Sequence, residues 1–140
     1  MKKINLAVID DDEMYVYAVK KLVEKVELAD RTVYFENGKV ALNYIDECIH
    51  HTYLLPEVIL LDLHMPITNG WQFIKEFKKL KIRIDKRITI YIISSTVNEE
   101  EIYRAKHIAE ITDFVCKPVT IDTFSVILAE MNYNNKINSN

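Results

Sequence analysis

The feature that most constrains the fold is an alternation of short β-branched segments with longer segments whose apolar residues recur every three or four positions. Such alternation is typical of an α/β protein in which strands and helices follow one another. Some strand candidates, such as Val58–Leu61, are apolar throughout, which indicates a doubly wound parallel sheet with helices on both faces. Five strands are predicted, at residues 4–9, 32–35, 58–61, 88–93 and 114–116, and each is followed by a helix.

Length and charge exclude several classes of protein. The chain has 140 residues, the usual size of one domain, and it is 49% hydrophobic and 28% charged, as ordinary globular domains are. With 21 acidic against 18 basic residues, it lacks the basic balance that direct nucleic-acid binding needs. No apolar stretch approaches the roughly 20 residues that cross a bilayer, so no membrane association is expected. Cys48 and Cys116 form no CxxC motif, which is typical of reduced cysteines in a cytoplasmic protein.

Acidic residues follow the first and third predicted strands. These are the run Asp10–Glu13 and the single Asp62. Ligands of doubly wound sheets bind at the carboxyl ends of the strands, so the carboxylates would face each other if these strands are neighbours. Two carboxylates about 4 Å apart repel by ~4 kcal/mol at an effective dielectric near 20, and a hard cation such as Mg²⁺ would offset this. The alternative is that the run only caps the first helix, which is the more frequent case for an isolated run.

Two further strand ends carry polar groups that suit phosphoryl chemistry. The fourth strand ends in Ser94 and the fifth is followed by Lys117. Alone, each would be explained as an ordinary strand-end serine or surface lysine. Together, the four strand ends offer two carboxylate sites, a hydroxyl and an ammonium. A carboxylate can attack a phosphoryl group whose oxygens a metal, a lysine and a hydroxyl stabilise. The set therefore indicates phosphoryl transfer.

The motifs at these strand ends resemble the response-regulator receiver domain of two-component signalling, over residues 4–131. The segments that carry the resemblance are Val8–Asp12, Leu60–Pro66 with Asn69-Gly70, Ile92–Ser95 and Phe114–Pro118. Each motif is weak alone, whereas their order and spacing are specific. The resemblance implies a flavodoxin-like (βα)5 fold with strand order 2-1-3-4-5. It also implies a receiver domain over residues 1–131, followed by a polar, disordered tail at residues 132–140.

The resemblance assigns the acidic residues to phosphorylation and metal binding. Asp62 is implied to be the phospho-acceptor and a ligand of Mg²⁺ or Mn²⁺. Asp11 is implied to bind the metal directly, Asp10 partly through water, and His64 through its main-chain carbonyl. Because His64 occupies a variable position of the family, it is also expected to influence the lifetime of the aspartyl phosphate.

The other residues carried over from the family are those that sense the phosphoryl group. Lys117 is implied to contact it, while Ser94 and Phe114 are implied to be the switch hydroxyl and the switch aromatic. The Lys117–Pro118 peptide bond is implied to be cis. Ser95 is larger than the residue often found there and is expected to restrict access to the phosphoryl group. Cys116, beside the site, is expected to be a buried, inert thiol.

These assignments lead to the hypothesis of a phosphorylatable switch rather than an enzyme. A sensor histidine kinase or histidine phosphotransfer protein would supply the phosphoryl group, and the face of the fourth helix, fifth strand and fifth helix would bind a downstream protein. A phosphatase with an aspartate nucleophile is the first alternative, although His64 stands where such enzymes have a second aspartate. A scaffold without phosphotransfer and a cofactor-binding flavodoxin-like protein are the others, but no glycine-rich loop follows the first strand.

Overall fold

The structure is a computed structural model that describes residues 3–138, with side chains described for residues 3–130. Five strands and five helices alternate along the chain, and a single turn of 3₁₀-helix, Thr52–Leu54, precedes the third strand. The strands are β1 (Ile4–Ile9), β2 (Ala29–Phe35), β3 (Val58–Leu61), β4 (Thr89–Ser94) and β5 (Ile111–Cys116). The helices are α1 (Glu13–Val26), α2 (Gly38–Glu47), α3 (Gly70–Lys81), α4 (Glu99–Lys106) and α5 (Ile121–Asn138).

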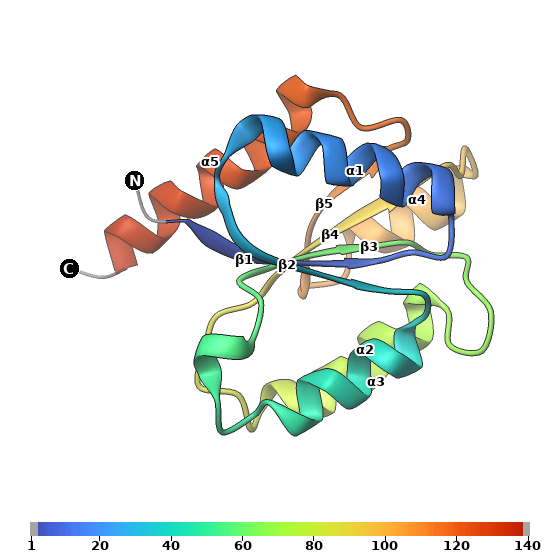
Figure 1. Cartoon of the computed structure of the whole chain (residues 1–140). Coiled ribbons are helices and arrows are strands. Elements are labelled where there is room, and N and C mark those ends of the chain that lie inside the picture. The colour runs from blue at the N-terminus through green and yellow to red at the C-terminus, as the bar shows by residue number, and fades with distance from the viewer. Residues whose placement is uncertain (1–2, 139–140) are drawn as a thin grey trace.

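All strands are parallel and form one sheet in the order β2-β1-β3-β4-β5. In Figure 1, α1 and α5 lie on one face of this sheet and α2 and α3 on the other. The doubly wound fold and the strand order predicted from the sequence are therefore confirmed. No helix among the described residues is both long enough and apolar enough to cross a membrane.

The core consists of two apolar layers separated by the sheet. Along β1, Ala7 and Ile9 point into the layer under α2 and α3, while Leu6 and Val8 point into the layer under α1 and α5. Every residue of the central strand β3 is buried. Burial on both faces explains why this strand is apolar at every position, since helices cover the sheet on each side.

The two edge strands are longer than the sequence predicted. β2 begins at Ala29 instead of Thr32, and β5 begins at Ile111 instead of Phe114. Both extensions contain exposed polar residues, such as Asp30 and Asp113, which the edges of a sheet tolerate but which hide a strand from a search for apolar runs. The backbone of helix α5 continues to Asn138, into the segment that was expected to be a tail. Residues 139 and 140 of the predicted tail lie outside the described residues.

Candidate functional site

The carboxylates after β1 and β3 meet because these strands pair directly, with Ile9 opposite Leu61. The backbone N–H of Asp62 donates to the carbonyl of Ile9 at 3.0 Å, and that of Asp10 donates to Phe35 at 2.9 Å. Carboxylate oxygens of Asp10, Asp11 and Asp62 all lie within 4.8 Å of one another. The predicted meeting of acidic groups at this edge is therefore confirmed.

Two of these carboxylates are buried, and this changes their affinity for protons. Asp10 is 3% exposed and Asp62 is 7% exposed. Burial raises the pKa of Asp10 from 3.8 to about 6, aided by repulsion from Asp62 and opposed by the Asp12 N–H and by Lys117. Burial also raises the pKa of Asp62, against the attraction of Lys117 and the N–H groups of Leu63 and His64. The positive charge and hydrogen-bond donors among the described residues therefore do not fully balance the negative charge of these carboxylates.

The run Asp10–Glu13 combines both roles that the sequence left open. Asp12 is the N-cap of α1, and its carboxylate accepts hydrogen bonds from the N–H groups of Met14 and Tyr15. The backbone N–H of Asp12 donates in turn to Asp10 Oδ1 at 2.9 Å. Asp12 thus caps the helix and also lies 3.7 Å from Lys117 Nζ, whereas Asp10 and Asp11 belong to the carboxylate cluster with Asp62.

Lys117 supplies the positive charge at the cluster. Its Nζ lies 2.9 Å from Asp10 Oδ2 and 3.8 Å from Asp62 Oδ2. The ammonium also lies 4.4 Å from the ring centroid of Tyr15, a cation–π contact. The bond from Lys117 to Pro118 is cis, as the resemblance implied.

Tyr15 is a neighbour of the site that the sequence analysis did not single out. It is 8% exposed, and its buried hydroxyl has no hydrogen-bond partner among the described residues. Burial and the charges of Asp10, Asp62 and Asp12 raise its pKa. Its position in the first turn of α1, two residues after the acidic run, was the signal that could have identified it.

Ser94 and Phe114 occupy neighbouring strands on the β4 side of the site. Ser94 is 1% exposed, and its Oγ accepts a hydrogen bond from the Thr96 N–H at 3.2 Å. The backbone N–H of Lys117 donates to the Ser94 carbonyl at 3.0 Å, so the hydroxyl residue and the lysine segment are joined. Phe114 is half-buried in β5, opposite Ile92.

The loop from β3 to α3 is shaped by two unusual positions. A Cβ on Gly70 would lie 2.4 Å from the carbonyl oxygen of Asp62, so only glycine allows this close approach. The N–H of Gly70 also donates to the Leu63 carbonyl at 2.9 Å. Ile67 adopts a φ of 67°, which is rare for a β-branched residue. The loop that follows Asp62 is thus tightly folded against α3.

Cavities lie on either side of the start of α1. One of about 610 Å³ is lined by residues that include Asp10, Asp11 and Ile67. Another of about 380 Å³ is lined by Tyr15, Lys117 and other residues. The carboxylate cluster and Lys117 are therefore bordered by open space.

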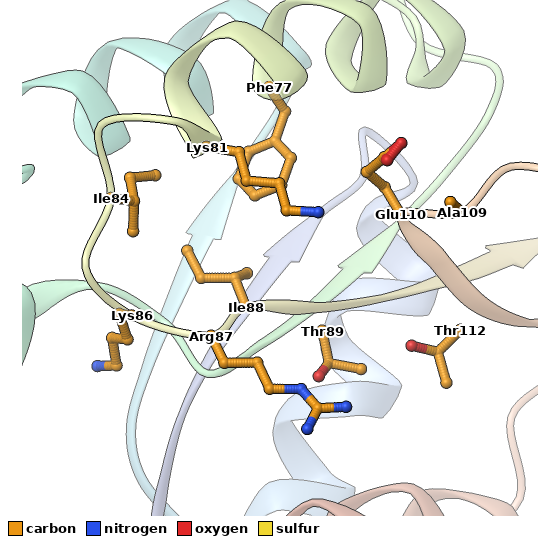
Figure 2. A pocket seen from close by; sticks show the side chains of 10 residues that line it. All are labelled: Phe77, Lys81, Ile84, Lys86, Arg87, Ile88, Thr89, Ala109, Glu110 and Thr112. Atoms are coloured by element: carbon orange, nitrogen blue, oxygen red, sulfur yellow. The ribbon is translucent and has the colours of Figure 1, made fainter.

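A smaller cavity of about 190 Å³, shown in Figure 2, lies away from the carboxylate cluster. It lies where α3 ends and β4 begins, and Lys81 and Arg87 line it from these segments. Glu110 is its one acidic lining residue and is paired with Lys78 at 3.4 Å. Because it lacks a carboxylate cluster, we place the chemistry at the strand ends near Asp62.

The donor set at the strand ends fits a hard divalent cation. The three clustered carboxylates offer oxygen atoms only, and Lys117 is the one cation paired with them in the described part of the chain. Mg²⁺ and Mn²⁺ prefer oxygen ligands and commonly use one or two carboxylates together with water and phosphate oxygens. Cys116, the nearby thiol, is exposed at the end of β5, so the expectation that it is buried is wrong.

Residues 6–129 match the family described as "Response regulator receiver domain". The chain belongs to this family. Receiver domains among solved structures share its fold. A two-component response regulator from Cytophaga hutchinsonii aligns with a TM-score of 0.83 at 21% identity, over 94% of this chain and 99% of that one. A response regulator receiver protein from Dyadobacter fermentans aligns with a TM-score of 0.74 at 28% identity, over 91% and 96% of the two chains.

Curated relatives carry receiver-like segments within longer proteins. A protein-glutamate methylesterase/protein-glutamine glutaminase of Geobacter sulfurreducens is 30% identical over 119 residues, which are 84% of this chain and 29% of that protein. The transcriptional regulatory protein YdfI of Bacillus subtilis is 35% identical over 102 residues, or 71% of this chain and 41% of that protein. The receiver domain therefore spans well under half the length of these relatives.

Proposed function

We propose that this receiver domain is a phosphorylatable switch in which Asp62 accepts a phosphoryl group from the phosphohistidine of a sensor histidine kinase or a histidine phosphotransfer protein. The observation that carries the proposal is the cluster of Asp10, Asp11 and Asp62 with Lys117 at its edge. Asp11, Asp62 and the main-chain carbonyl of His64 would hold Mg²⁺ or Mn²⁺, with Asp10 acting partly through water. The bound cation would neutralise the phosphoryl oxygens.

The hydrogen bonds at Asp62 indicate which oxygen attacks. Oδ1 accepts the N–H of Leu63 at 2.8 Å, whereas Oδ2 faces Lys117 at 3.8 Å. Attack by Oδ2 forms the new P–O bond as the P–N bond of the donor breaks, and the electron pair of that bond stays on the imidazole nitrogen. Lys117 Nζ then lies beside the transferred group and stabilises its negative charge.

The response to phosphorylation would pass through Ser94 and Phe114. The Ser94 hydroxyl ends the strand next to β3, where it can turn to hydrogen-bond a phosphoryl oxygen. Phe114 lies in β5, half-buried against the core, and would follow that movement. The face formed by α4, β5 and α5 would then bind a downstream protein in the cytoplasm, without direct contact to nucleic acid or membrane.

The test is phosphorylation by a small phosphodonor. The protein is incubated with Mg²⁺ and acetyl phosphate, and intact mass is measured before and after alkaline treatment, which cleaves acyl phosphates. One alkali-labile phosphate is expected, and it should be lost in Asp62→Asn. Asp46→Asn is the matched control, because Asp46 lies on α2 outside the cluster, where its exposed side chain pairs with Arg83. Absence of any modification in the wild-type protein would refute the proposal and favour a scaffold.

A phosphatase with an aspartate nucleophile remains as the alternative within the same chemistry. Such an enzyme needs a general acid for the leaving group, and His64 stands at the position where a second aspartate would supply it. Repeated turnover of a phosphomonoester, in place of a single modification, would support this alternative.

A further inference from the structure

Glu101 in the first turn of α4 connects three segments around the phosphorylation site. Its carboxylate is 3.0 Å from His64 Nε2, two residues after the acceptor aspartate. The same carboxylate accepts a hydrogen bond from Thr96 Oγ1 at 3.0 Å. Its backbone N–H donates to Asn98 Oδ1, the N-cap of the helix. Glu101 thus links the loop after β3 to the loop after β4.

Thr96 connects this link to the predicted switch hydroxyl. The Thr96 N–H donates to Ser94 Oγ at 3.2 Å, and Thr96 Oγ1 accepts from the N–H of Asn98 at 3.2 Å. A Ser94 hydroxyl that turns to a phosphoryl oxygen would leave the Thr96 N–H without its acceptor. Thr96 thus joins Glu101 to the strand end that carries Ser94.

We infer that Glu101 is a positioning residue that holds the His64 imidazole away from the aspartyl phosphate and so prolongs its lifetime. This inference rests on the proposed phosphorylation of Asp62. While Nε2–H of His64 is directed at the Glu101 carboxylate, that nitrogen cannot accept a proton from water. Release of the ring would place an imidazole base next to the acyl phosphate.

The hydrolysis that Glu101 restrains can be written with its atoms in balance. A water oxygen attacks phosphorus, and a proton of that water passes to the ring nitrogen of the released His64 imidazole that carries no hydrogen. The bond between phosphorus and Asp62 Oδ2 breaks, and its electron pair remains on the carboxylate. The products are inorganic phosphate, the free aspartate and a protonated imidazole, which returns its proton to solvent.

The ion pair between His64 and Glu101 is partly exposed, so breaking it should change the lifetime of the aspartyl phosphate only moderately. The side chain of His64 is 61% exposed and that of Glu101 is 25% exposed. Exposed ion pairs of this kind change an equilibrium by about two- to fivefold. We therefore expect Glu101→Ala to shorten the lifetime of the aspartyl phosphate by about two- to fivefold.

Glu100 provides a matched control. It lies in the same helical turn as Glu101 and is exposed, and its side chain makes no hydrogen bond or ion pair within the described part of the chain. Glu100→Ala removes the same charge from the same end of the helix dipole. An effect specific to Glu101 thus cannot come from helix charge alone.

The experiment measures decay of the phosphorylated protein after the phosphodonor is removed. The variants are Glu101→Ala, Glu100→Ala, His64→Ala and the double variant His64→Ala with Glu101→Ala. Faster decay is expected in Glu101→Ala only, and the double variant should decay like His64→Ala. Equal decay in Glu101→Ala and wild type, or faster decay that persists without His64, would overturn the inference.

A second measurement separates this inference from the proposed function. Hydrogen exchange of the unphosphorylated protein reports the link without any phosphoryl group, and the Asn98 amide, which donates to Thr96 Oγ1, should exchange faster in Glu101→Ala than in Glu100→Ala. No phosphate uptake by the wild-type protein would refute the proposed function and, with it, the role in lifetime. Uptake together with unchanged decay and exchange would refute only the role of Glu101.

Discussion

Replacement of Asp10 by asparagine should stabilise the metal-free protein at neutral pH. The pKa of Asp10 is raised from 3.8 to about 6, mainly because the side chain is buried. The folded state therefore binds the proton of Asp10 more tightly than the unfolded state does. This contribution to stability is complete below about pH 4 and is lost as the pH rises through about 6.

The magnitude follows from the same two pKa values. One pH unit of difference corresponds to about 1.4 kcal/mol, so ionised Asp10 costs about 3 kcal/mol at pH 7.5. Asparagine resembles the protonated acid and avoids this cost. The variant should therefore exceed wild type in free energy of unfolding by about 3 kcal/mol at pH 7.5 and by only about 1 kcal/mol near pH 4.5.

Urea denaturation in the presence of EDTA, followed by circular dichroism, measures this difference. Asp11→Asn is the control, since Asp11 is exposed and its substitution should change stability by less than about 1 kcal/mol. Added Mg²⁺ should narrow the gap between Asp10→Asn and wild type, because a cation that binds the folded state stabilises it. A variant that is no more stable than wild type at pH 7.5 would refute the argument from burial.

Two further substitutions test the packing around the site. Gly70→Ala should lower the free energy of unfolding by about 1–3 kcal/mol in urea denaturation, because the new Cβ meets the Asp62 carbonyl at 2.4 Å. Gly38→Ala should cost less, since its nearest neighbour is the Thr68 methyl group at 2.9 Å, and equal losses would contradict this reasoning. Tyr15→Phe should leave the thermal unfolding midpoint unchanged or higher, because it removes a buried hydroxyl without a partner among the described residues. A marked fall in that midpoint would mean that the hydroxyl is hydrogen-bonded.

The sequence was sufficient to predict the fold because its central strands are buried on both faces. Val58–Leu61 is apolar throughout, so β3 was identified with the bounds that the structure has. The edge strands were predicted too short, because β2 and β5 begin with residues that face solvent, among them Arg31 and Thr112. Local patterns recover an element best where both faces need apolar residues.

The sequence predicted the residues of the candidate site that lie at strand ends. It did not predict the contacts that long side chains make across the site. Pairing of β1 with β3 brings Asp10 and Asp62 together by backbone geometry alone. The contacts of Lys117 with the Tyr15 ring and of His64 with Glu101 join residues that are far apart in the chain. No sequence period encodes such contacts, since they depend on which rotamers the packed helices allow.

The backbone hydrogen bonds at the site divide it into two parts that differ in rigidity. The amides of Asp10 and Asp62 are bonded to the neighbouring strands, so the segments that carry these carboxylates are extensions of the sheet. The segment from Thr96 to Asn98 is held by side-chain hydrogen bonds from Ser94, Thr96 and Asn98. Opening this segment costs much less free energy than disrupting the sheet. A charge added at Asp62 would therefore displace the segment on the β4 side, while Asp62 itself would stay in place.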